Sequence, residues 1–297
     1  MIGVVSPATG RLYPVKMRCE AFGVPRSSFY ASAGTATSEG AEEAQVGKRG
    51  PKTALSDAEL VDKIRETINQ SPFHGEGYRK VHARLGLRVG KDRVLRLMRE
   101  NGLLAPVRRV HPHGLKAHDG TIITAAPDLM WGTDATRFDT AEDGMVWFFG
   151  ALDHCVADVV GWHVAKVGNR FAALEPVRQG VHRWFGPAGK DVARGLKLRH
   201  DHGTQYMSRD FQAELAYLGI ASSPAFVREP EGNGVAERFM RTLKEQCLYL
   251  HRFRNLEEAR AVISKFIQHY NDHWILQRLE HRSPLQARRE HLQRKAA

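Results

Sequence analysis

Two hydrophobic periodicities follow one another along the chain and divide it into segments. In the first, between residues 56 and 101, apolar side chains recur every three or four positions, which predicts short amphipathic helices. Ser56 and Glu59 have the spacing of a capping box at a helix start, and Gly102 is placed to end the last helix. The expected helices lie at 56–70, 75–85 and 91–101.

From Asp128 the period falls to two, which is typical of strands. Three strands are expected first, and then strand and helix alternate. This order favours an α/β core with a mixed sheet flanked by helices. The expected strands are 129–138, 145–152, 159–167 and 196–199, and the expected helices are 170–185, 209–218, 235–250 and 256–270.

The remaining segments complete the domain organisation. Residues 14–22 and 25–30 favour two short helices separated by Gly23, as in a helix-turn-helix fragment, although a simple helical hairpin fits equally well. We therefore expect an N-terminal helical segment, a linker, a helix-turn-helix domain, a basic linker, the α/β core and a basic C-terminal tail. Their bounds are 1–34, 35–52, 53–104, 105–125, 126–287 and 288–297.

Positive charge gathers on the helix-turn-helix segment. The formal net charge is +11, and eleven Lys and Arg lie between residues 76 and 116 against three acids. In the helix at 91–101, Val94, Leu97 and Met98 share an apolar stripe, and the cations step around the other side. This pattern suits a recognition helix in a DNA major groove, although a surface helix with scattered arginines remains the alternative. The candidate DNA-binding residues are Lys91, Arg93, Arg96 and Arg99.

Three carboxylates stand in contexts that suit metal-dependent phosphodiester chemistry. Asp134 lies in a strand-like stretch, Asp201 directly follows a short strand, and Glu237 opens a helix, with thirty-five residues between Asp201 and Glu237. Carboxylate oxygens are the ligands that Mg²⁺ and Mn²⁺ prefer. A pair of such ions can activate the attacking oxygen and stabilise the leaving one. Capping roles for the aspartates and a surface ion pair from Glu237 to Arg241 are the alternatives.

Other polar residues stand close to these acids in sequence. Arg241 and Lys244 share a helical face with Glu237, so they are candidate contacts to the DNA backbone. Three further residues are candidates to line the site: His202, Gln205 and Asn233. The remaining acids of the core fall in predicted turns, where we expect solvated side chains: Asp139, Glu142, Asp143, Asp153 and Asp158.

The motifs around the three acids also carry a family resemblance. Trp-Gly-Thr-Asp-Ala-Thr at 131–136, His-Asp-His-Gly-Thr-Gln-Tyr at 200–206 and Gly-Asn-Gly-Val-Ala-Glu-Arg-Phe at 232–239 resemble motifs of the OrfB-type insertion-sequence transposases, which have a retroviral-integrase-like core. The resemblance extends from about residue 13 to 287. It implies an RNase-H-like fold and a DDE transposase that cleaves element ends and joins them, with Asp134, Asp201 and Glu237 holding two Mg²⁺ or Mn²⁺ ions.

The same resemblance implies the setting of the reaction. The partner would be double-stranded DNA, bound by a homodimer or higher oligomer, together with a protein from an upstream reading frame. The protein would act in the bacterial cytoplasm at the nucleoid, and the sequence has no apolar stretch long enough for a membrane span. Lys244 would hold the terminal DNA.

Two segments depart from the family pattern. Residues 272–281 lack the proline expected after Tyr270-Asn271, and the turn 153–158 lacks the usual Ser-Arg. Neither departure touches the three acids. A DNA-binding regulator with an inactive core and an RNase-H-like nuclease both remain open at this point.

Overall fold

The computed structural model describes residues 5–35, 55–106, 122–225 and 233–296. The chain divides into two compact units, Met1–Ala54 and Leu55–Ala297. Most of the two expected linkers, 35–52 and 105–125, lies outside the described residues.

The first unit contains two short helices on either side of a glycine turn. They are α1 (Val15–Ala21) and α2 (Arg26–Thr35). Gly23 between them has a φ of +62°, which only a residue without Cβ adopts readily. The side chains of Cys19 and Phe29 are buried, and the guanidinium of Arg18 lies 5.3 Å from the centre of the Phe29 ring. The two predicted helices are therefore present, and the second is longer than expected.

The second unit begins with the three helices that the periodicity predicts: α3 (Asp57–Gln70), α4 (Tyr78–Leu85) and α5 (Lys91–Glu100). The capping box is formed, because the Ser56 hydroxyl accepts from the Glu59 N–H and the Glu59 carboxylate accepts from the Ser56 N–H. The stripe of α5 closes a small core with residues of α3 and α4: Leu60, Val61, Ile64, Val81, Val94, Leu97 and Met98.

The α/β core is built on one five-stranded mixed sheet. Its strands are β1 (Met130–Thr140), β2 (Gly144–Asp153), β3 (Val159–Ala165), β4 (Lys197–His200) and β5 (Ala221–Pro224), in the order β3-β2-β1-β4-β5. The first three pair antiparallel, and β4 and β5 continue the sheet in parallel with β1. This is the RNase-H-like topology. Strand β5 was not predicted, since Ala-Ser-Ser-Pro has no apolar pattern and pairs through its backbone.

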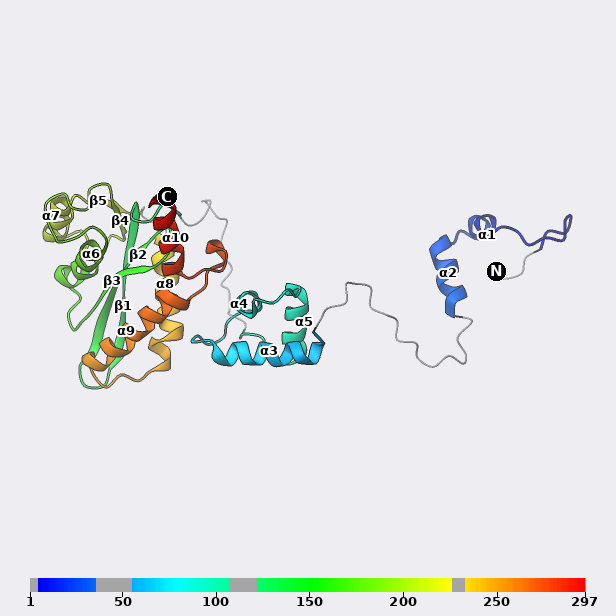
Figure 1. Ribbon diagram of the computed structural model, residues 1–297, viewed down its shortest axis with the longest axis horizontal. Coiled ribbons are helices and arrows are strands. Elements are labelled where there is room, and N and C mark those ends of the chain that lie inside the picture. Colours follow the sequence, from blue (N-terminus) through cyan, green and yellow to red (C-terminus); the bar gives the residue numbers. More distant parts are fainter. Residues whose placement is uncertain (1–4, 36–54, 107–121, 226–232, 297) are drawn as a thin grey trace. The chain divides into compact units, whose positions relative to one another are not determined.

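Helices cover both faces of this sheet (Figure 1). On one face α6 (Arg170–Trp184) and α7 (Arg209–Leu218) pack around Trp131 and Phe149. On the other, α8 (Gly234–Gln246) and α9 (Leu256–His273) pack against Phe148. The 3₁₀ turns η2 (Leu248–Leu250) and η3 (Gln277–Leu279) follow them. In the described ranges no helix is long and apolar enough to cross a membrane.

The C-terminal segment differs from the expectation of a basic tail. Residues 288–297 fall mostly within α10 (Pro284–Ala296), and Arg288 is fully buried. Its guanidinium donates to both carboxylate oxygens of Asp158, at 2.8 and 3.0 Å, and to Asp128 at 2.7 Å. It also lies 3.5 Å from the Asp153 carboxylate. Asp153 and Asp158 are therefore buried ion-pair partners, and the expectation that they are solvated is wrong.

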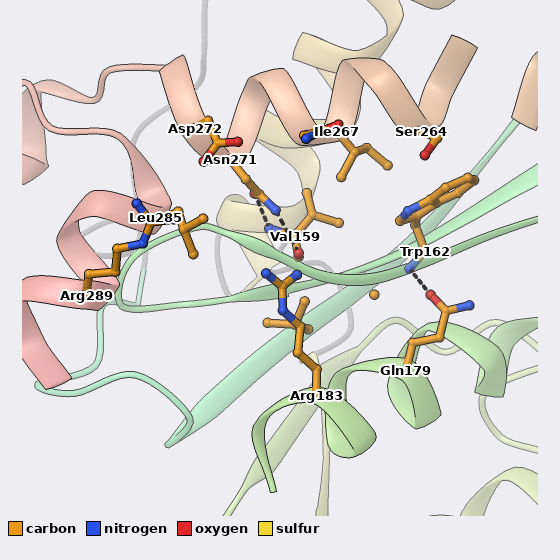
Figure 2. A pocket seen from close by; sticks show the side chains of 13 residues that line it. Val159, Trp162, Gln179, Arg183, Ser264, Ile267, Asn271, Asp272, Leu285 and Arg289 are labelled. Atoms are coloured by element: carbon orange, nitrogen blue, oxygen red, sulfur yellow. Dashed lines mark hydrogen bonds between the residues drawn. The ribbon is translucent and has the colours of Figure 1, made fainter. Parts of the chain in front are cut away.

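One edge of the sheet, strand β3, is partly covered by polar side chains (Figure 2). Asn271 of α9 donates to the Val159 carbonyl and accepts from the Val159 N–H, and Gln179 of α6 accepts from the Trp162 N–H. These contacts occupy backbone groups that would otherwise pair with another strand. They also line a cavity of about 470 Å³ between β3, α6, α9 and α10, which contains none of the three candidate acids.

Candidate active site

Two neighbouring parallel strands carry the two aspartates. Asp134 lies in the middle of β1, and Asp201 follows the last residue of β4. The pairing of Met130 with Lys197 sets a register offset that, continued along the strands, brings Asp134 and Asp201 to the same level. The Asp201 carboxylate accepts from the Gly203 N–H at 2.8 Å, which holds it in the turn after the strand. The sheet thus brings together two acids that are far apart in sequence.

Helix α8 brings the third acid to β1. Glu237 lies in the first turn of α8, where the helix dipole favours a negative charge. Immediately before the helix, the buried Asn233 amide donates to the carbonyl of Thr133 at 3.0 Å, next to Asp134 in the chain. A Cβ on Gly132 would lie 2.6 Å from the Asn233 Oδ1, so only glycine allows this close approach. Asn233 therefore anchors the start of α8 on β1.

Acids and cations together line the resulting pocket of about 380 Å³. It is lined by Asp134, Glu237, Met240, Arg241, Lys244, Glu245 and Tyr249. Burial, together with the charges of Asp201 and Glu237, raises the pKa of Asp134 to about 6, against the lowering effect of the Ala135 N–H and Lys244. Burial also raises the pKa of Glu237, and Arg241 opposes this. The charges of Asp201 and Glu237 therefore both act on Asp134, although Asp201 does not itself line this pocket.

This electrostatic arrangement fits a divalent cation. A bound cation would offset both the repulsion and the burial of Asp134, and the ligands offered are hard carboxylate oxygens, as Mg²⁺ prefers. Among the residues that the structure describes, no three His, Cys, Asp or Glu side chains are close enough together to enclose an ion. The acids thus interact electrostatically but do not form a complete set of metal ligands by themselves. Their charge and ligand type suit the use of a divalent metal ion.

The candidate lining residues differ in their surroundings. Asn233 is buried, whereas His202 is exposed. Gln205 lies beside Asp201, since a Cβ built on Gly203 would meet the side chains of both within 3 Å. Tyr249 was missed by sequence reasoning. Its ring is 73% exposed at the rim of the pocket, and a large exposed aromatic side chain in an otherwise ordinary helical end gives no sequence signal.

The cations of α5 fall into two groups. Arg93 and Arg96 both bind the Asp57 carboxylate at the start of α3, and Arg96 also binds Glu100. Their side chains are 18% and 42% exposed. Lys91 and Arg99 are exposed, and no ion pair is found for them within the described ranges. Lys91 and Arg99 therefore carry the most accessible charges on this helix. The ion pair of Arg93 with Asp57 instead joins α5 to α3.

Comparisons with known proteins agree with this domain order. The family model described as an integrase core domain matches residues 218–284, and the one described as an HTH-like domain matches residues 55–111. Transposase InsD of insertion element IS2A/D/F/H/I/K from Escherichia coli is 29% identical over 262 residues, covering 84% of this chain and 83% of the relative. InsD of IS2-9 from Escherichia coli strain K12 matches at the same identity over 81% of its length.

Among solved structures, the chain is similar to one in a simian T-cell lymphotropic virus intasome, with 15% identity, a TM-score of 0.47, and coverage of 78% of this chain and 74% of that one. It is also similar to the catalytic core domain of BIV integrase, with 19% identity, a TM-score of 0.42, and coverage of 57% and 99% respectively.

The sheet topology and the two family domains define a DNA-binding polynucleotidyl transferase of the DDE type. Within that class, the chain is similar to insertion-sequence transposases and contains an HTH-like domain followed by an integrase core domain. The two domains and these relatives support DNA transposition or integration as its activity.

Proposed function

We propose that Asp134, Asp201 and Glu237 are the catalytic residues of a DNA transposase and hold two Mg²⁺ or Mn²⁺ ions. When bound, the ions would activate the attacking oxygen and stabilise the leaving oxygen of the phosphodiester. The observation that carries the proposal is the proximity of the three carboxylates, which come from β1, the end of β4 and α8. The charges of Asp201 and Glu237 add to burial in raising the pKa of Asp134.

The chain's own residues place the DNA. Arg241 and Lys244 line the same pocket as Asp134 and Glu237, one and two turns further along α8, and Tyr249 lies at its rim. A phosphate held by these cations would lie beside the acids, and the Tyr249 ring offers a stacking surface for a base. Water would attack one strand at the element end, and the freed 3′-hydroxyl would then attack a second phosphodiester.

The finer partners belong to the same proposal. The substrate would be the two ends of the element and a target duplex, so that at least two copies of the chain act together. Lys91, Arg93, Arg96 and Arg99 of α5 would bind DNA near the ends, and a protein from an upstream reading frame would join the complex. His202 and Gln205 would line the site beside Asp201.

A cleavage assay tests the catalytic assignment. The substrate is a labelled duplex with the inverted repeat that flanks the gene, supplied with Mg²⁺ or Mn²⁺. Asp134→Asn, Asp201→Asn and Glu237→Gln should each abolish cleavage and leave duplex binding within about twofold of wild type. Asp139→Asn is the matched control, because Asp139 is an exposed acid on β1. Cleavage retained by any of the three variants would remove that residue from the site.

A further inference from the structure

The divergent segment 272–281 contacts the helix-turn-helix domain. Trp274, just past the end of α9, packs edge-on against Phe73 with ring centres 4.8 Å apart and an interplanar angle of 88°. The Lys80 ammonium lies 3.1 Å from the centre of the Trp274 ring. Phe73 is 4% exposed and belongs to the apolar cluster of the α/β core, although it lies between α3 and α4 in the chain. An aromatic anchor thus joins the two domains.

Directional hydrogen bonds surround this anchor. The Gln246 amide accepts from the His74 N–H and donates to the His74 carbonyl, both at 2.9 Å. Arg84 of α4 donates to the carbonyl of His273 at 2.9 Å, and Arg79 donates to Gln277 at 3.2 Å. These bonds join the same two domains as the aromatic pair, so they fix orientation as well as contact. We call this interface the dock. On the helix-turn-helix side it consists of Phe73, His74 and the three cations of α4, and on the core side it consists of Trp274, Gln246, His273 and Gln277.

One buried acid orients the cations of the dock. The Glu76 side chain is 4% exposed and accepts from Arg84 at 2.5 and 3.0 Å and from the Ser71 hydroxyl at 2.8 Å. Lys80 lies 3.7 Å from the same carboxylate. A buried carboxylate needs such partners, so Glu76 holds Lys80 and Arg84 where they reach the core. These two members of the basic segment therefore face the protein rather than DNA.

The dock reaches the catalytic helix. Gln246 is the last residue of α8, two positions beyond Lys244, so the same helix carries Glu237 near its start and a dock residue at its end. Interfaces between domains are mobile unless they are large or well anchored, and aromatic contacts near the centre of an interface commonly supply such an anchor; here Phe73 is buried and Trp274 is partly buried. The recognition helix α5 and the acids thereby belong to one connected unit.

We propose that the dock holds the helix-turn-helix domain at a fixed distance from the catalytic acids and so selects which phosphodiester is cut, measured from the DNA that α5 binds. The inference rests on the function proposed above. It gives the divergent residues 272–281 a role: Trp274 and its neighbours are positioning residues that act through the domain they hold. A displacement of about 1 Å between substrate and catalytic groups can cost on the order of a hundredfold in rate.

The test compares Trp274→Ala and Gln246→Ala with wild type, in the full chain, on the labelled inverted-repeat duplex. We expect duplex binding within about twofold of wild type, cleavage at the wild-type position reduced by about tenfold or more, and products spread to neighbouring positions. Nicking of a plasmid without the repeat, in Mn²⁺, should be unchanged. Phe171→Ala is the matched control, since Phe171 is an exposed aromatic residue on α6, outside the dock.

Unchanged position and rate of cleavage in both variants would overturn the inference, and so would an equal loss of plasmid nicking. Hydrogen exchange of residues 71–77 gives a second measurement that needs no activity. The His74 amide should be protected in wild type and lose protection in Gln246→Ala. An unprotected amide in wild type would show that the dock does not form. If the wild type cleaves nothing while this amide is protected, the proposed function fails and the dock stands.

Discussion

Replacement of Asp134 by asparagine should stabilise the metal-free protein at neutral pH. The pKa of Asp134 is about 6 in the folded chain against an ordinary value of 3.8, and burial is the largest cause. Folding therefore disfavours the ionised form. Well below pH 3.8 the carboxyl is neutral in both the folded and unfolded chain and costs nothing. As the pH rises from about 3.8 to about 6 the stability of the folded state falls, because the carboxyl ionises in the unfolded chain while burial beside two other acids disfavours its ionisation in the folded chain; above pH 6 the full cost is reached.

The size of the effect follows from the difference of about 2 pH units. Each unit corresponds to about 1.4 kcal/mol, so the cost is at most about 3 kcal/mol, and about half of that after screening by solvent at the pocket mouth. Asp134→Asn keeps the shape and removes the charge. Its unfolding midpoint at pH 7.5 should therefore rise by roughly 3–10 °C in a chelating buffer, with little gain at pH 4.

Calorimetry with and without Mn²⁺ checks the reasoning. Mn²⁺ should raise the unfolding midpoint of wild type and not that of Asp134→Asn, since the ion would stabilise only a folded site that holds it. Asp139→Asn, on the same strand and exposed, should shift the midpoint by less than about 1 °C. If Asp134→Asn is no more stable than wild type at pH 7.5, burial and the charges of Asp201 and Glu237 do not destabilise the Asp134 carboxylate, and the reasoning fails.

Three further predictions follow from particular contacts. Gly132→Ala should lower cleavage with duplex binding unchanged, because its Cβ would displace the amide that anchors α8, whereas Gly189→Ala, with its nearest neighbour at 3.9 Å, should have no effect on cleavage. Arg288→Ala should lower the free energy of unfolding in urea by about 3–5 kcal/mol, since it leaves buried carboxylates unpaired; a loss as small as that of exposed Arg289→Ala would refute this. Arg99→Ala should weaken duplex binding in fluorescence anisotropy and lower the slope of log affinity against log salt by about one, and an unchanged slope would remove Arg99 from the DNA contact.

Local sequence signals located most elements of the fold. The capping box at Ser56, the apolar stripe of α5 and the alternation of β1 to β3 each depend on residues a few positions apart, so their patterns are visible in the chain itself. Strand β5 gave no such pattern, because its polar residues take part only through backbone pairing with β4. Residues 288–297, most of which lie in α10, were expected to form a basic tail, and the buried residue among them is the cation Arg288.

The candidate site shows the same division. The contexts of Asp134, Asp201 and Glu237 and their order along the chain indicated a metal-dependent site, and helical spacing put Arg241 and Lys244 beside Glu237, where the pocket has them. The bond from Asn233 to the strand and the exposed ring of Tyr249 needed coordinates. The anchor depends on a carbonyl a hundred residues away, and no local pattern carries that information.

The sequence by itself therefore determined the class of fold, the order of domains and the chemistry that three acids can perform, because periodicity and motif spacing are properties of short stretches. Only the tertiary structure decided what each charge does. Arg93 faces Asp57, Lys80 lies on Trp274, and Arg288 lies among buried carboxylates, although all three are cations in basic stretches of sequence. The physical reason is that a charge's role is set by burial and by the partner it meets, and both come from segments distant along the chain.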